Sequence, residues 1–269
     1  MLHLHYKKVN WIETWNLIQS SKKCFLLLGL ISFIISKIIS SFRLNIYFKN
    51  INISLSQLLN LKLYWLGMFY NLFLPGSIGG DAYKVMILNR QTKVSIKTLI
   101  SAVLFDRISG VLALFGLASF TTYLIDGSGN YFLLFFLSTI LLMAFYYWVM
   151  MKVLKPHSIL QCFVQTVLLG FIVQLFQTIC VIFILKAMAI EQNFSEYILL
   201  FLLSSIAAIL PISIGGLGIR EMVYLWGCTN FSLNEHQGIS ISLLFYGTTV
   251  LVSFVGILWV FKNPFSIKN

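Results

Sequence analysis

Apolar positions in this chain form long continuous runs instead of alternating with polar positions. A run of about 20 apolar residues is long enough to cross a bilayer as a helix, and the alternation typical of a membrane β-barrel is absent. The predicted spanning segments are residues 24–42, 96–124, 131–151, 163–188 and 237–261. The pattern therefore predicts an all-α fold, a multi-pass membrane bundle.

Two more apolar stretches, residues 54–74 and 195–210, each end in nearly the same string. Residues 75–80 read PGSIGG and residues 211–216 read PISIGG, and a basic residue follows four positions later in each case, Lys84 and Arg220. Proline removes a backbone donor and glycine permits left-handed backbone, so each string predicts a break before a short helix, at about 80–90 and 217–228. Matched breaks in two halves of a membrane protein indicate a substrate site.

The order of these segments predicts an inverted repeat. If each broken element is a re-entrant hairpin, three spans separate the two copies, and the second copy enters from the opposite face. One transmembrane domain, residues 24–262, would then contain repeat A (about 24–124) and repeat B (about 163–261). If instead each broken element crosses the membrane fully, this inverted-repeat topology is wrong. Residues 1–23 are expected to lie at the membrane surface, with Trp11, Trp15 and Ile18 along one helical face, and residues 263–269 form a tail.

Composition and charge are consistent with a membrane protein. The chain is 59% hydrophobic and 10% charged, and its net charge of +11 comes from basic residues near the ends of apolar segments, which argues against nucleic acid as a partner. The positive-inside rule predicts that one side is cytoplasmic. That side holds Arg43, Lys49, Arg90, Lys93, Lys97, Lys152, Lys155, Lys262 and Lys268. The other side holds Asp126, Glu191, Glu196 and Glu235, together with N-terminal lysines that fit this rule poorly.

The glycines of the two strings are candidate anion-binding positions. The helices that begin after Gly79-Gly80 and Gly215-Gly216 would point free N–H groups and a positive dipole end into the protein. Such helix ends bind phosphate, and Lys84 and Arg220 would add full positive charges one turn further on. The alternative is that these glycines only permit close helix packing.

Ionisable side chains inside apolar segments need partners, because each costs about 2.5–3.5 kcal/mol at the bilayer centre. Asp106 and Arg107 are adjacent in a span, so they point about 100° apart and should pair with other helices. Asp81 is either an N-cap or a partner of Lys84. Lys37 either snorkels to the surface or joins the same cavity. We expect one network, functional or purely structural, of Asp81, Lys84, Asp106, Arg107, Arg220 and Glu221.

Three motifs in this order resemble the lysylphosphatidylglycerol synthase transmembrane region, a flippase-like membrane family. They are residues 71–84 (NLFLPGSIGGDAYK), Asp106-Arg107, and residues 211–221 (PISIGGLGIRE), and the resemblance covers about residues 10–262. The chain differs from the usual family pattern in three ways. Lys84 stands where the family usually has Arg; one more N-terminal span is usual, which suggests a truncated or derived start; and no soluble synthase domain follows, so aminoacyl transfer is not expected.

The resemblance implies translocation of a phospholipid or a lipid-linked anionic headgroup from the inner to the outer leaflet of a bacterial cytoplasmic membrane. Two alternatives remain at this point. One is an accessory protein that binds a lipid-linked glycan or a glycosyltransferase, and the other is an intramembrane lipid transferase. No hydrolase, nucleotide-binding or metal motif is present, so we expect no cofactor and no metal. A homo-oligomer or a glycan-pathway partner is compatible with the sequence.

Overall fold

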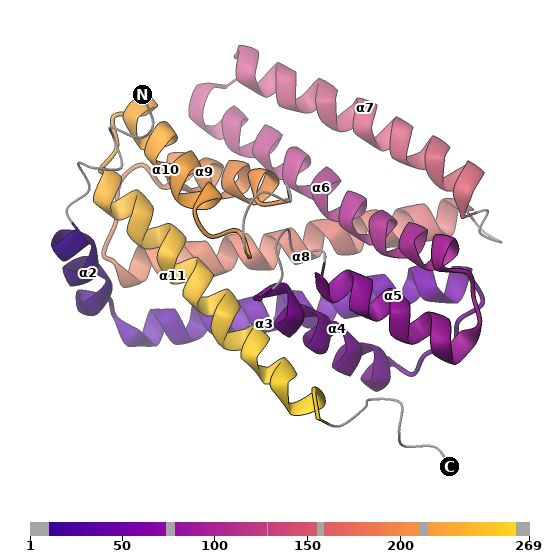
Figure 1. The fold of residues 1–269 in the computed structure, drawn as a ribbon. Coiled ribbons are helices and arrows are strands. Elements are labelled where there is room, and N and C mark those ends of the chain that lie inside the picture. The colour runs from indigo at the N-terminus through magenta and orange to yellow at the C-terminus, as the bar shows by residue number, and fades with distance from the viewer. Residues whose placement is uncertain (1–10, 74–78, 128, 155–158, 210–214, 262–269) are drawn as a thin grey trace.

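The computed structural model describes residues 11–73, 79–127, 129–154, 159–209 and 215–261, and within these ranges the regular structure is entirely helical. Five long apolar elements match the predicted spans: α3 (Lys23–Asn50), α6 (Ile96–Asp126), α7 (Asn130–Val153), α8 (Ile159–Ala187), and α11 (Glu235–Phe254) with the short η1 (Val255–Trp259). Each has at least 24 residues, more than the roughly 20 that a bilayer requires. The predicted helical membrane bundle is confirmed (Figure 1).

The first span is longer than the sequence pattern predicted. It was expected to end at residue 42, but α3 continues to Asn50. Arg43 and Asn45 interrupt the apolar run, yet Leu44, Tyr47 and Phe48 are buried and keep the helix packed against its neighbours. The expectation that Arg43 lies among the charges at the membrane face is therefore wrong, since Arg43 is inside the bundle with only 5% of its surface exposed.

Both broken elements fold back on themselves as pairs of short helices, α4 (Gln57–Asn71) with α5 (Gly79–Thr92), and α9 (Phe194–Ala207) with α10 (Ile219–Asn230). In the first pair, Tyr70 stacks near Tyr83 and Tyr64 lies under Lys84, so the two helices run in opposite directions. In the second pair, Ser205 faces Arg220. The helices have 12 to 15 residues, about 18–23 Å at 1.5 Å per residue, too short to cross about 30 Å of hydrocarbon.

We call α4–α5 the first hairpin and α9–α10 the second hairpin. That each one re-enters the membrane from its own side remains a prediction, as does the division into repeats A and B. Residues 75–78 and 211–214 of the two matched strings lie outside the described residues, and so do the basic residues Lys7, Lys8, Lys155, Lys262 and Lys268.

Two apolar cores lie on either side of a polar layer. One contains Phe33 of α3, Cys180 of α8 and residues of the second hairpin. The other contains Leu44 of α3, Val167 of α8 and residues of the first hairpin. The long helix α3 packs along α8 through both cores, and α6 lies beside α7, α8 and α9. The helices α3, α6 and α8 therefore pass from one core to the other through the polar layer, and the candidate site is found there.

Candidate functional site

A polar cavity of about 220 Å³ lies at the centre of the bundle. Its walls come from α3, α6 and α8 near their midpoints and from both hairpins. Four basic side chains and one carboxylate line it: Lys37, Arg43, Arg107, Arg220 and Asp106. The uncharged polar lining consists of Ser40, Tyr64, Gln174, Gln177 and Ser205. We call this space the central cavity.

Asp106 is paired with a residue that the sequence analysis did not assign to the site. Arg43 Nε donates to Asp106 Oδ1 over 2.7 Å, and both side chains are almost completely buried. Arg43 Nη1 is buried without a hydrogen-bond partner among the described residues. Gly110 of α6 and Gly170 of α8 flank the guanidinium group, and an added Cβ at either position would be in ordinary contact with Nη1, at 3.5 and 3.4 Å.

Asp81 holds two cations of the first hairpin and α6. Its Oδ1 accepts from Lys84 Nζ at 3.0 Å, and its Oδ2 accepts from Arg107 Nε at 2.5 Å. Lys84 also lies over the Tyr64 ring, 4.6 Å from its centroid, and is buried. As expected, Asp106 and Arg107 pair with other helices and not with each other. Lys84 faces Asp81 and Tyr64, and it does not line the central cavity.

Lys37 and Arg220 have no carboxylate partner within ion-pair distance in the part of the chain that the structure describes. Lys37 joins the cavity, and its Nζ lies 4.5 Å from the centroid of the Phe33 ring. Arg220 Nη1 donates to Ser205 Oγ at 3.0 Å and Ser204 Oγ at 3.4 Å, and its guanidinium carbon lies 5.0 Å from the Phe245 ring. These contacts orient two positive charges without neutralising them.

Glu221 is turned away from the predicted network. Its Oε2 accepts from the N–H of Gly218 at 2.6 Å, and its Oε1 accepts from Ser242 Oγ at 2.7 Å. The carboxylate thus caps the start of α10 and ties it to α11. Of the six residues expected in one network, Asp81, Lys84 and Arg107 are linked directly. Asp106 and Arg220 reach the same cavity through other partners, and Glu221 belongs to a separate contact.

The glycines of the first string permit a close helix contact. A Cβ on Gly80 would overlap the carbonyl oxygen of Gly67, so α5 begins against the backbone of α4. The Gly80 N–H is not free, since it donates to Asn71 Oδ1 over 2.8 Å. Gly79 is the first residue of α5. In this structure the packing role of Gly80 is visible directly, whereas contact of Gly79 or Gly80 with an anion remains a prediction.

The glycines of the second string form a turn instead of a helix start. Gly215 and Gly216 have φ angles of 63° and 91°, a region that residues with a side chain rarely adopt. A Cβ on Gly216 would lie 3.0 Å from Arg220 Nε. A Cβ on Gly215 would lie 3.9 Å from the carbonyl oxygen of Asn71, at the end of α4. Among the described residues, the end of α4 therefore lies near the turn that precedes α10, while the convergence of the two breaks on one site remains a prediction.

Two glutamines of α8 were missed by the sequence analysis. Gln174 and Gln177 are buried and line the central cavity, and Gln174 Oε1 has no hydrogen-bond partner among the described residues. Their spacing of three residues on an otherwise apolar span places them on one helical face, a signal that was available in the sequence. Among the residues that the structure describes, no three His, Cys, Asp or Glu side chains come together as metal ligands would.

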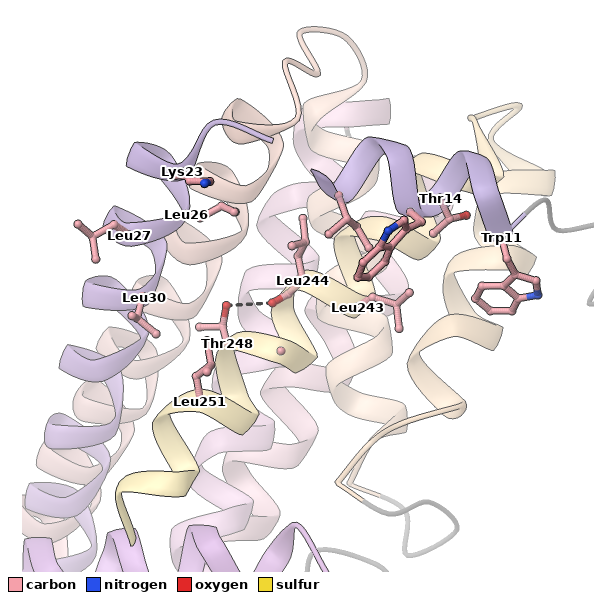
Figure 2. Close-up of a pocket in the computed structure, with 13 residues that line it drawn as sticks. Trp11, Thr14, Lys23, Leu26, Leu27, Leu30, Leu243, Leu244, Thr248 and Leu251 are labelled. Carbon is pink, nitrogen blue, oxygen red and sulfur yellow. Dashed lines mark hydrogen bonds between the residues drawn. The ribbon is translucent and has the colours of Figure 1, made fainter. Parts of the chain in front are cut away.

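A separate groove of about 610 Å³ lies between α2 (Trp11–Ser20), the start of α3 and α11. Figure 2 shows Leu26, Leu27 and Leu30 of α3 across from Leu244 and Leu251 of α11. Among the described residues that line this groove, Lys23 alone is charged. The groove contains none of the predicted site residues, so the central cavity is the better candidate for a charged substrate.

Comparison with protein families agrees with this architecture. The family model of the lysylphosphatidylglycerol synthase transmembrane region matches residues 1–161 and 155–256. The chain belongs to this family. It is therefore a membrane protein linked to lipid handling. No curated protein matches the chain in sequence.

Proposed function

We propose that the protein moves a phospholipid or a lipid-linked anionic headgroup across the bacterial cytoplasmic membrane, from the inner to the outer leaflet. The observation that supports this most directly is the pair of partly buried cations, Lys37 and Arg220, that face the central cavity without a carboxylate partner among the described residues. A charge inside a membrane costs several kcal/mol unless a partner compensates it. An anionic headgroup supplies that partner.

The chemistry of the lining suits a phosphate group. The Arg220 guanidinium is planar and can donate two parallel hydrogen bonds to phosphate oxygens, while Lys37 supplies a compact charge. Gln174 and Gln177 add neutral donors and acceptors for the rest of a headgroup. Lys84 is engaged by Asp81, so we propose that it acts by holding Asp81 and Arg107 in place.

The test is translocation of a fluorescent phosphatidylglycerol in vesicles that contain the purified protein. Lys37→Ala and Arg220→Ala should each slow translocation about tenfold or more, because a hydrogen bond to a charged group contributes about 1.5–3 kcal/mol. Lys49→Ala is the matched control, since Lys49 is exposed on the same helix as Lys37, and it should translocate at the rate of the original protein.

Three results would contradict the proposal. The first is that vesicles with the protein scramble lipid no faster than empty ones while still binding it, which is the behaviour of an accessory protein. The second is that lipid recovered after incubation is covalently altered, which indicates a transferase. The third is that the double variant Lys37→Ala with Arg220→Ala moves lipid at the original rate, which would show that the two cations of the cavity are not needed for translocation.

A further inference from the structure

A larger apolar groove adjoins the central cavity on the side of α5 and α6. It has a volume of about 610 Å³, within the range of small-molecule binding sites. Arg107, Val111 and Ile209 line both spaces, so the groove and the cavity share a wall. We call it the α5–α6 groove.

The groove runs from the C-terminal end of α5 and the start of α6 towards the middle of the bundle. Asn89, Arg90 and Ile96 line it near the connection between α5 and α6, and Asp81 and Arg107 line it at the hairpin tip. The 14 residues of α5 cover about 20 Å, comparable with the roughly 15 Å depth of one leaflet of hydrocarbon. The groove therefore has the length of a lipid acyl chain.

The walls of the groove are apolar and open to the outside of the bundle. Met86, Ile100 and Leu104 line it and are 52%, 44% and 51% exposed. Exposed apolar side chains on spanning helices face lipid tails. A basic residue stands at each end: the exposed Arg90, with no carboxylate near it among the described residues that line the groove, at the outer end, and Arg107, paired with Asp81, at the shared wall. This arrangement matches an anionic lipid, in which one charged group is attached to a long apolar chain.

We propose that the α5–α6 groove is the site where the anionic lipid is loaded. Its acyl chain lies against Met86, Ile100 and Leu104, and its headgroup starts near Arg90 and passes Arg107 to reach the central cavity. This inference rests on the proposed function. It adds the path that the lipid takes and the leaflet from which it is loaded. That leaflet is the one on the side of Arg90, and the distribution of charge predicts that this side is cytoplasmic.

The test uses a phosphatidylglycerol with a photoreactive diazirine in its acyl chain, incorporated with the full-length protein into nanodiscs. After irradiation, mass spectrometry locates the labelled residues. The groove-facing positions of α5 and α6 should be labelled several-fold more than the exposed outer face of α7, which includes Leu133, Leu137 and Leu141. Equal labelling of the two surfaces would overturn the inference, because it would mean that ordinary bilayer contact explains the signal.

Substitutions that fill the groove provide the second part of the test. Leu104→Trp should lower groove labelling and slow translocation about tenfold. Met86→Trp, on the opposite wall, should have the same effect, and it carries the test if Leu104→Trp folds poorly. Leu124→Trp is the matched control, because Leu124 is 58% exposed on the same helix but outside the groove, and it should change neither quantity.

The outcomes separate the two proposals. If the original protein moves lipid and both groove variants keep full labelling and rate, the loading site is wrong and the proposed function stands. If the original protein labels in the groove but moves no lipid, the proposed function fails and the groove remains supported as a lipid-binding site. Crosslinks from the groove to a second copy of the chain, in place of lipid, would also overturn the inference.

Discussion

Single side chains in the polar layer are held by specific contacts, and the buried pair of Arg43 and Asp106 illustrates how. The pair sits between two apolar cores, with glycines of α6 and α8 beside the guanidinium group. Breaking such a pair is costly, because the remaining charge stays buried without compensation. Replacing both partners by apolar groups avoids that penalty.

Asp106→Asn is therefore expected to destabilise the protein by about 3–5 kcal/mol, since it leaves Arg43 charged and unpaired. The double variant Arg43→Met with Asp106→Leu should recover a large part of the loss. The free energy of unfolding of both variants is measured in detergent, with circular dichroism recorded against temperature or denaturant. If the double variant is as unstable as the single one, the pair is not the reason for the loss.

The short helices of the hairpins depend on glycine for their spacing. The backbones of α4 and α5 approach so closely at Gly67 and Gly80 that no side chain fits between them. This contact puts the start of α5, with Asp81 and Lys84, beside the polar layer. The position of the site thus depends on the packing of one residue pair.

Gly80→Ala should destabilise the first hairpin and reduce the yield of folded protein, because its Cβ would overlap the backbone of Gly67, which cannot move aside as a flexible side chain can. Gly247→Ala in α11 is the control, since nothing lies within 4 Å of its added Cβ. That substitution should be neutral or stabilising by up to about 1 kcal/mol. If the melting temperatures of Gly80→Ala and Gly247→Ala fall by the same amount, this explanation is contradicted.

The helices and their breaks could be predicted from the sequence because apolar runs and Pro/Gly strings act locally. The proximity of Asn71, at the end of the first hairpin's α4, to Gly215, just before α10, is consistent with the matched breaks but does not test whether they form one site. What could not be predicted was the choice of partners. Arg43 was assigned to a membrane face because it follows an apolar run of ordinary length, and Glu221 was assigned to the network because it adjoins Arg220. Both assignments depend on long-range packing that no local pattern records.

Across the molecule, the predicted distribution of charge makes the membrane orientation testable. Gln91, near the end of α5, is exposed and lies on the side predicted to be cytoplasmic. Gln192, between α8 and α9, is also exposed and lies on the side predicted to be external. The native Cys24 is exposed, whereas Cys162, Cys180 and Cys228 are buried. Labelling experiments therefore need only Cys24 to be replaced.

In a Cys24→Ser background, a membrane-impermeant maleimide added to intact cells should label Gln192→Cys and should leave Gln91→Cys unlabelled. Gln91→Cys should become labelled once the cells are permeabilised, which shows that the thiol itself is reactive. Equal labelling of both variants in intact cells would mean that the two hairpins do not enter from opposite faces.

Asn71 gives the two hairpins a mechanical link. Its side chain holds the start of α5, and its backbone carbonyl lies against the turn at Gly215. If the protein moves lipid as we propose, a tilt of either hairpin would displace this residue and would be expected to move the other hairpin with it.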